Sequence, residues 1–211
     1  MASPNSSLVS LVSKAGDRAA ETPVSSLFIG RWSSRAMTGE PIPDDVLFAL
    51  FEAARFAPSS NNSQPWRFAF ARRGEPDFDT FVGCLNEGNQ VWAKDASALV
   101  LIASKAAFTP AGKTEQSISS CASFDTGAAW ASLAFQAALL GWTTRAMGGF
   151  DKDRARIAAQ APDGLKLEAM IAIGRRGDLS SLPADRQPLE KPNARKSIAE
   201  IVFAGGFPAD C

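Results

Sequence analysis

Apolar residues recur at helical spacing in Asp44–Ala57, which predicts an amphipathic helix. Asp44 and Asp45 lie in its first turn, where the helix dipole favours negative charge, and Pro58 ends it. We predict three further helices, of which the second is the longest and is rich in alanine: Phe78–Leu85, Ser123–Leu140 and Asp151–Ala159.

Short apolar runs between these helices predict the strands. Trp66–Ala71 alternates, with its three aromatic residues on one side, and Ala98–Ala103 is continuously apolar, as in a buried strand. Trp142–Ala146 and Leu167–Ile173 are the other predicted strands. Several helices combined with a few strands predict an α+β or three-layer domain.

The remaining segments set the expected domain organisation. Residues 1–21 are rich in serine and alanine, and we interpret them as an N-terminal extension that is partly disordered. Residues 22–211 are expected to form a single domain. Within it, the polar stretch 104–123 predicts a long loop or lid, and the proline-containing stretch 180–211 predicts an extended arm.

The composition limits the chemistry that side chains can perform. The 211 residues include no histidine and no tyrosine. A chain without histidine cannot run a Ser-His-Asp or Cys-His relay, and it lacks the usual ligand of zinc and non-haem iron sites, so no metal site is predicted. Proton chemistry must come from carboxylates, lysine, water or a bound cofactor.

Charge and hydropathy argue against several partners. The chain has 22 basic and 22 acidic residues and no basic block, which argues against a nucleic-acid binder. No apolar run approaches the roughly 20 residues that span a bilayer, so no membrane partner is expected. The three cysteines are far apart and form no C-x-x-C pair. We therefore expect free thiols and a cytoplasmic location.

Four polar motifs stand out as candidate binding sites. Arg31–Arg35 combines two guanidinium groups with two hydroxyls, a set suited to phosphate. Pro58–Trp66 offers neutral donors and acceptors suited to the amide edge of a heterocycle, and Met147–Phe150 has adjacent glycines that let a ligand approach the backbone. Arg195 is a further candidate phosphate ligand. Taken singly, each motif is also compatible with an ordinary surface segment, loop or turn.

Taken together, these motifs resemble the FMN-dependent nitroreductase family, with the resemblance running from about residue 24 to 207. They share one order along the chain: Arg31-x-Ser33-x-Arg35, Pro41-x-Pro43, Glu52-Ala53-Ala54-Arg55-x-Ala57-Pro58-Ser59-Ser60-x-Asn62-x-Gln64-Pro65-Trp66, Asn89-x-x-Trp92, Phe124-Asp125-x-Gly127, Met147-Gly148-Gly149-Phe150-Asp151, Asn193-x-Arg195 and Ile198-x-Glu200-Ile201. The resemblance implies a nitroreductase-like three-layer fold with a mainly antiparallel sheet flanked by helices, and a homodimer with FMN at its interface.

The resemblance also assigns roles to individual residues. It implies that Arg31 and Arg195 hold the FMN phosphate, helped by Ser33 and Asn193, and that Arg35 reaches the N1–C2=O edge of the flavin. A cation at that edge favours reduction. The other implied cofactor-binding residues lie at the pyrimidine edge, in the loop laid on the partner's flavin, or near flavin N5: Trp32, Pro58, Ser59, Ser60, Asn62, Gln64, Asn89, Met147, Gly148 and Gly149.

The activity implied by the resemblance is ping-pong hydride transfer through flavin N5, with NADPH or NADH as donor. The acceptors are nitroaromatics, quinones or similar electron-poor compounds, and no catalytic side chain is required. Phe108, Phe124 and Trp142 are candidate substrate-site residues. Two alternatives remain open: a member specialised for an enal, a semialdehyde or free flavin, and a flavin-binding dimer without turnover.

Departures from the family pattern narrow the choice of branch. Trp92 stands where some members have lysine, and Gly148 stands where others have an acid. Ser33 stands where the flavin-cleaving enzymes that make dimethylbenzimidazole have aspartate, which disfavours that activity. The iodotyrosine-deiodinase branch uses a lid tyrosine, and this chain has no tyrosine.

Overall fold

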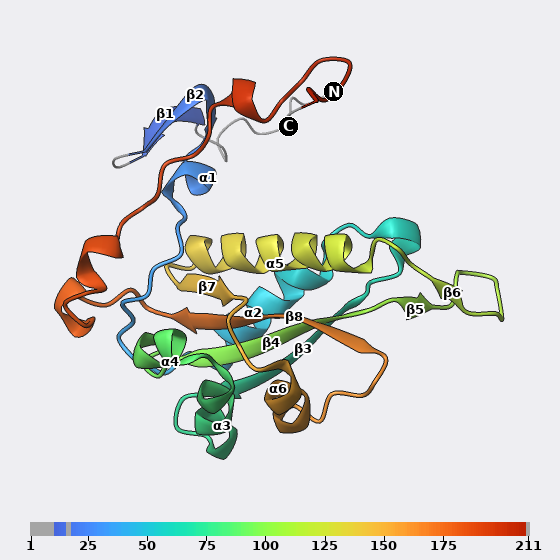
Figure 1. The fold of residues 1–211 in the computed structure, drawn as a ribbon, viewed down its shortest axis with the longest axis horizontal. Coiled ribbons are helices and arrows are strands. Elements are labelled where there is room, and N and C mark those ends of the chain that lie inside the picture. Colours follow the sequence, from blue (N-terminus) through green and yellow to red (C-terminus); the bar gives the residue numbers. More distant parts are fainter. Residues whose placement is uncertain (1–10, 16–17, 210–211) are drawn as a thin grey trace. The chain divides into compact units, whose positions relative to one another are not determined.

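The computed structural model in Figure 1 describes residues 11–15 and 18–209. Within these residues the chain divides into two compact units, one of residues 33–190 and one made from the two terminal stretches up to Trp32 and from Lys191 onward. We call the first the sheet unit and the second the terminal unit. The expectation of a single domain from residue 22 to 211 therefore differs from the structure, which groups part of the N-terminal stretch with the C-terminal arm.

The sheet unit is built on a four-stranded antiparallel sheet in the order β3-β4-β8-β7. Phe68 of β3 lies opposite Ile102 of β4, and Ile102 lies opposite Ala169 of β8. All four strands match predicted strands, with bounds of Trp66–Arg72 for β3, Ala98–Lys105 for β4, Thr143–Met147 for β7 and Leu165–Gly174 for β8.

Two helices, α2 (Asp44–Arg55) and α5 (Ala122–Leu139), cover one face of this sheet. Both were predicted, because each places apolar residues on the side that meets the strands. The cluster they form with the sheet, which we call the α5-side core, includes these fully or almost fully buried residues: Leu47, Leu50, Val100, Ala129, Leu133, Ala137, Trp142 and Ile171.

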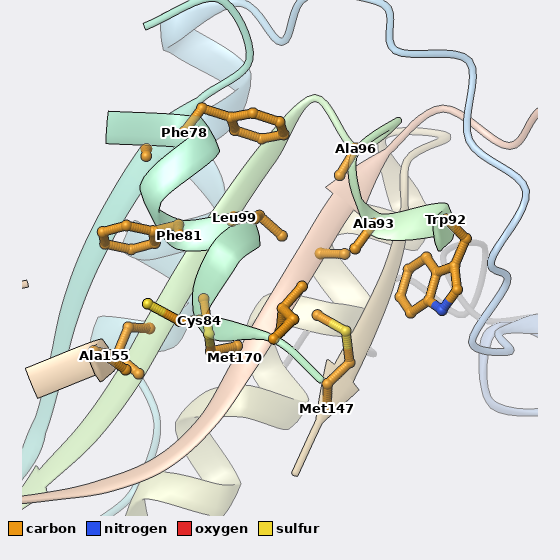
Figure 2. Packing of buried hydrophobic residues seen from close by; sticks show 14 of the residues in the cluster. Phe78, Phe81, Cys84, Trp92, Ala93, Ala96, Leu99, Met147, Ala155 and Met170 are labelled. Carbon is orange, nitrogen blue, oxygen red and sulfur yellow. The ribbon is translucent and has the colours of Figure 1, made fainter. Parts of the chain in front are cut away.

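Three short helices cover the other face: α3 (Pro76–Cys84), α4 (Glu87–Ala93) and α6 (Lys152–Ala158). Figure 2 shows the cluster beneath them, which we call the α3-side core, with Phe78 and Phe81 at one end and Trp92 and Met147 at the other. Helices α3 and α6 were predicted. Helix α4 was recognised only as the Asn89-x-x-Trp92 motif.

The predicted lid and arm contain more regular structure than expected. The stretch 104–123 holds the end of β4 and a small hairpin of β5 (Ala107–Phe108) and β6 (Ser117–Ile118). The stretch 180–211 contains 3₁₀ turns at Gln187–Leu189 and Ile198–Glu200, and a third turn, Leu179–Ser181, overlaps its start. These turns lie within or at the start of the stretch for which the prolines predicted an extended arm.

The terminal unit contains an antiparallel hairpin of β1 (Leu11–Ala15) and β2 (Arg18–Ser25), followed by helix α1 (Ser26–Gly30). The expected domain start near Thr22 falls inside β2. Much of the N-terminal extension is therefore strand, while residues 1–10 and 16–17 lie outside the described residues. Across the described stretches, no helix is both long and apolar enough to cross a membrane.

Candidate functional site

The turn after β7 and the start of α4 bring three predicted site residues together. Asn86 caps α4 by accepting the Asn89 N–H at 3.0 Å, and the Asn89 side-chain amide donates to the Gly149 carbonyl at 3.1 Å. A Cβ on Gly149 would collide with the Asn86 amide, whereas a Cβ on Gly148 would meet nothing within 4 Å. Gly149 therefore permits close packing, and Gly148 leaves its backbone open to a ligand.

Met147 precedes these glycines, but its side chain faces the interior. It is 4% exposed and belongs to the α3-side core with Trp92 (Figure 2). Met147 was predicted to bind the cofactor, and only its backbone is available to do so. Its packing instead fixes the end of β7 against α4.

A buried carboxylate organises the segment that contains Ser33 and Arg35. Glu190 Oε1 accepts from Ser34 Oγ at 2.6 Å, from the Arg35 N–H at 2.6 Å and from the Ala36 N–H at 2.9 Å. Its Oε2 is 3.7 Å from Arg35 Nη1 and has no hydrogen-bond partner among the described residues. The Glu190 side chain is only 5% exposed, so these contacts hold Arg35 in place from below.

A second arginine lies beside this pair. Arg145 Nη1 donates to the Ser33 carbonyl at 2.6 Å, and its guanidinium carbon is 5.8 Å from the centre of the Trp92 ring. Burial lowers the pKa of Arg145 and the charge of Arg35 lowers it further, while Glu190 acts in the opposite direction. Two guanidinium groups thus share one carboxylate, which leaves a net positive charge here.

The predicted flavin-facing loop is well formed and largely exposed. Asn61, Asn62 and Gln64 all have positive φ, between 47° and 53°, a conformation that asparagine tolerates and that glutamine adopts less often. The Ser60 N–H donates to buried Asp125 Oδ2 at 3.0 Å, and the Gln64 N–H donates to Ser59 Oγ at 3.1 Å. These bonds hold the loop while it turns most of its polar side chains outward, the exposed members including Pro58, Ser60, Asn62 and Gln64.

The three aromatic residues predicted for the substrate site have different surroundings. Phe108 is half-buried and lines a cavity of about 390 Å³ together with Asn62 and Lys105. Phe124 is 81% exposed at the start of α5. Trp142 is the most enclosed of the three, because its side chain is 3% exposed, packs in the α5-side core and lies under the Arg175 guanidinium.

The terminal unit gathers arginines from both ends of the chain. Arg31, which follows α1, has a pKa lowered first by burial and then by the charges of Arg18 and Arg195. The Asn193 carbonyl accepts from Arg195 Nη1 and from Arg18 Nε, each at 3.2 Å. The two predicted phosphate ligands, Arg31 and Arg195, are therefore within electrostatic reach of each other, and the half-buried Trp32 follows Arg31 directly.

Sequence reasoning missed three charged residues of these clusters: Arg18, Arg145 and Glu190. Each lies outside the motifs that carried the resemblance, and each gains its significance only from partners elsewhere in the sequence. By contrast, Asn86 could have been recognised, because an asparagine directly before Glu87 is a helix N-cap signal.

Comparison with known proteins places the chain among relatives of one kind. A family model described as the nitroreductase family matches residues 29–175. An uncharacterised 15.4 kDa protein of Mycolicibacterium smegmatis is 33% identical over 150 residues, which are 66% of this chain and 95% of that protein. A Polynucleobacter asymbioticus protein with a provisional name as an NADH dehydrogenase/NAD(P)H nitroreductase is 28% identical over 80% of this chain and 91% of its own length.

Solved structures agree with this assignment. A crystal structure described as an oxidoreductase containing FMN is 44% identical, covers 93% of this chain and 99% of its own, and superposes with a TM-score of 0.89. A nitroreductase family protein from Clostridium difficile 630 shares the fold at 20% identity, covering 86% of this chain and 97% of its own with a TM-score of 0.65. The chain belongs to the nitroreductase family, and the predicted α+β fold with its antiparallel sheet is confirmed.

Proposed function

We propose that this nitroreductase-family oxidoreductase uses FMN to pass electrons from NADPH or NADH to nitroaromatics, quinones or similar electron-poor acceptors. The observation that carries the proposal is the grouping of Arg31 and Arg195, which come from opposite ends of the chain and crowd their positive charges in one unit. The phosphate of FMN is an anion whose charge suits such a group of cations.

The sheet unit fits the other parts of FMN. Arg35 and Arg145 with one carboxylate leave a net positive charge, which suits a ring that gains negative charge on reduction. The open backbone at Gly148 and the amide of Asn89 suit the edge of a flat heterocycle that carries its own donors and acceptors. These features would hold and orient the ring.

Bound FMN would supply the hydride- and electron-transfer chemistry, for which no side chain is required. The protein itself would orient the flavin ring and tune its reduction. Glu190 fixes the main chain at Arg35 by accepting two backbone N–H groups, and its other oxygen pairs with the Arg35 guanidinium at 3.7 Å. Arg145 adds a second positive charge next to it.

We also propose that the active form is a homodimer. The loop Pro58–Gln64 is held by hydrogen bonds to Ser59 and Asp125 and yet is mostly exposed in one chain. Helix α5 leaves the large apolar side chains of Phe124 and Leu139 81% and 65% exposed. A second copy would cover such side chains and would bring the loop to a flavin held by its partner. Sedimentation of the FMN-loaded protein tests this, because a stable loaded monomer would contradict it.

The function is tested by adding FMN to the purified protein, removing the excess and recording the absorbance spectrum. We expect a yellow protein that is bleached by NADPH or NADH without oxygen and is reoxidised by menadione or nitrofurazone. A protein that cannot retain FMN contradicts the proposal. A yellow protein that is not bleached by either donor would instead be a flavin-binding protein without this activity.

Substitution of the phosphate ligand sharpens that test. We expect Arg31→Ala to weaken FMN binding by about 2 kcal/mol, the scale of one charged hydrogen bond, and to leave riboflavin binding unchanged because riboflavin has no phosphate. Fluorescence titration with the two flavins measures both affinities. Equal losses for FMN and riboflavin would mean that Arg31 does not contact the phosphate.

A further inference from the structure

Arg18 joins the two segments that hold the predicted phosphate ligands. Its Nη1 donates to the Ile29 carbonyl at 3.0 Å and to the Arg31 carbonyl at 2.8 Å, and its Nε donates to the Asn193 carbonyl at 3.2 Å. The guanidinium thus ties the end of α1 to the C-terminal segment, with residues 29–31 on one side and residue 193 on the other. Its position in β2 lies outside the stretch matched by the family model.

Among the described residues, the charges around Arg18 are mostly positive. Burial lowers its pKa and the charge of Arg195 lowers it further. Among the described residues, no carboxylate forms an ion pair with Arg18 or Arg195. Glu21 is the nearest acid along β2, and its Oε1 accepts the Ile198 N–H at 3.0 Å.

A cavity adjoins this cluster within the terminal unit. It measures about 800 Å³, and its lining combines Arg18, Arg195 and Lys196 with apolar residues such as Val24 and Phe28. Three cations from two distant stretches of sequence therefore face one cavity, with Glu21 as the acid in its described lining. Cations gathered in this way favour a compact anion with more than one negative charge.

We propose that Arg18 is a third arginine of the phosphate site, where it binds the doubly charged phosphate monoester and positions Arg31 and Arg195 around it. The inference rests on the proposed function, because FMN is the phosphate monoester concerned. It adds to that function a residue contributed by the N-terminal hairpin. The hairpin then becomes part of the cofactor site, and selection of FMN over riboflavin depends on it.

The test compares affinities for FMN and riboflavin in four proteins: the wild type, Arg18→Gln, Arg18→Lys and Arg156→Gln. Arg156 is a matched control, because its guanidinium also donates to three main-chain carbonyls, those of Ala161, Pro162 and Leu165, but in the sheet unit. We expect Arg18→Gln to weaken FMN binding by about 10- to 100-fold and riboflavin binding by less than about 3-fold. Arg156→Gln should leave the ratio of the two affinities unchanged.

Arg18→Lys separates charge from geometry. It keeps the positive charge but cannot form the same fork to three carbonyls, so we expect a loss of FMN affinity smaller than that of Arg18→Gln. The salt dependence of FMN binding should remain near that of the wild type in Arg18→Lys and should weaken in Arg18→Gln. If Arg18→Gln does not fold, as judged by circular dichroism, the lysine variant decides: an unchanged ratio of FMN to riboflavin affinity overturns the proposal.

A second measurement separates this inference from the proposed function. Inorganic phosphate is titrated into the flavin-free wild type and into Arg18→Gln, and the thermal midpoint is followed. We expect phosphate to raise the midpoint of the wild type more than that of the variant. If neither flavin binds the wild type, the proposed function fails while this result still decides on the anion site. Equal responses of the two proteins would overturn the role of Arg18.

Discussion

The two faces of the sheet anchor different halves of the candidate site. On the α3 side, Trp92 and Met147 are buried, and they fix α4 and the end of β7, from which Asn89 and Gly149 meet. On the α5 side, buried Trp66 and Asp125 fix the two ends of the Pro58–Gln64 loop region. On each face, apolar packing thus fixes the position of one set of polar groups: Asn89 and Gly149 on the α3 side, and the Pro58–Gln64 loop on the α5 side.

The faces also differ in what they leave exposed. Helix α5 buries one side against the sheet and leaves Phe124 and Leu139 on the other side open. On the α3 side, helix α4 buries Trp92 and Ala93 and leaves Val91 42% exposed, and Ile157 of α6 is 78% exposed. Both faces therefore leave apolar side chains exposed, but only the α5 side also carries the exposed Pro58–Gln64 loop.

The largest expected effect concerns the α5-side core. Leu133→Ala should lower the free energy of unfolding by about 3 kcal/mol, because Leu133 is fully buried and its removal leaves a cavity between α5 and the sheet. Leu139→Ala is the matched control on the same helix, since Leu139 is 65% exposed and should change the stability by less than about 0.5 kcal/mol. Urea denaturation followed by circular dichroism measures both.

The same two variants also test whether α5 has a buried inner side and an outer side that a second copy covers. If the outer side of α5 is covered by a second copy, Leu139→Ala should weaken self-association in sedimentation experiments although it hardly affects the monomer. An Leu139→Ala protein that is as strongly destabilised as Leu133→Ala when monomeric would contradict the assignment of an inner and an outer side.

Sequence reasoning located the main elements because burial imposes a period on them. The stripe of α2 and the continuous apolar run of β4 are each longer than a few residues, so their pattern stands out from the background. Helix α4 was missed because it is short and contains Gly88, and the hairpin of β1 and β2 was missed because its sequence is mixed in character. Their structure depends on caps and on pairing with other segments.

Site residues that belong to a sequence motif could be predicted. Site residues that are brought together only by the tertiary structure could not. Asn89 and Gly149 were both predicted, and the structure adds the contact between them. Glu190 gave no signal, because a single glutamate near prolines becomes informative only when the fold places it beneath Arg35. Trp142 was chosen as a candidate because aromatic residues often line ligand sites. The sequence alone does not show that its ring packs in the α5-side core.

On the α3 side, we expect a smaller loss of stability than for Leu133→Ala, caused by the single Cβ atom that Gly149→Ala adds. Gly149→Ala should lower the free energy of unfolding by about 1 to 2 kcal/mol, because the new Cβ would collide with the Asn86 amide that caps α4. Gly148→Ala is the control, since nothing lies within 4 Å of its added Cβ. Thermal and urea denaturation compare the two. Equal stability of both variants would show that α4 adapts freely and that this half of the site is not tightly packed.

The smallest effect is a pH dependence at the polar end of the α5 side. Burial disfavours the ionised carboxylate of Glu168, but hydrogen bonds from Ser104, Ser123 and Lys166 outweigh burial, so its pKa lies below the ordinary value of 4.5. The bonds to the two serines are both 2.6 Å long. A lowered pKa in the folded state means that the ionised group stabilises the fold above about pH 4.5 and that this contribution is lost as the pH falls through the lower, folded-state pKa.

Glu168→Gln should therefore reduce the stability at neutral pH and flatten the fall in stability between neutral and acidic pH. Because part of this carboxylate is exposed, solvent screens the effect and we expect it to be the weakest of the three. Urea midpoints of the wild type and the variant at a series of pH values measure it. If the two plots of urea midpoint against pH stay parallel into the acid range, ionisation of Glu168 does not contribute to stability. The hydrogen bonds to Glu168 would then matter no more than those of an ordinary surface residue.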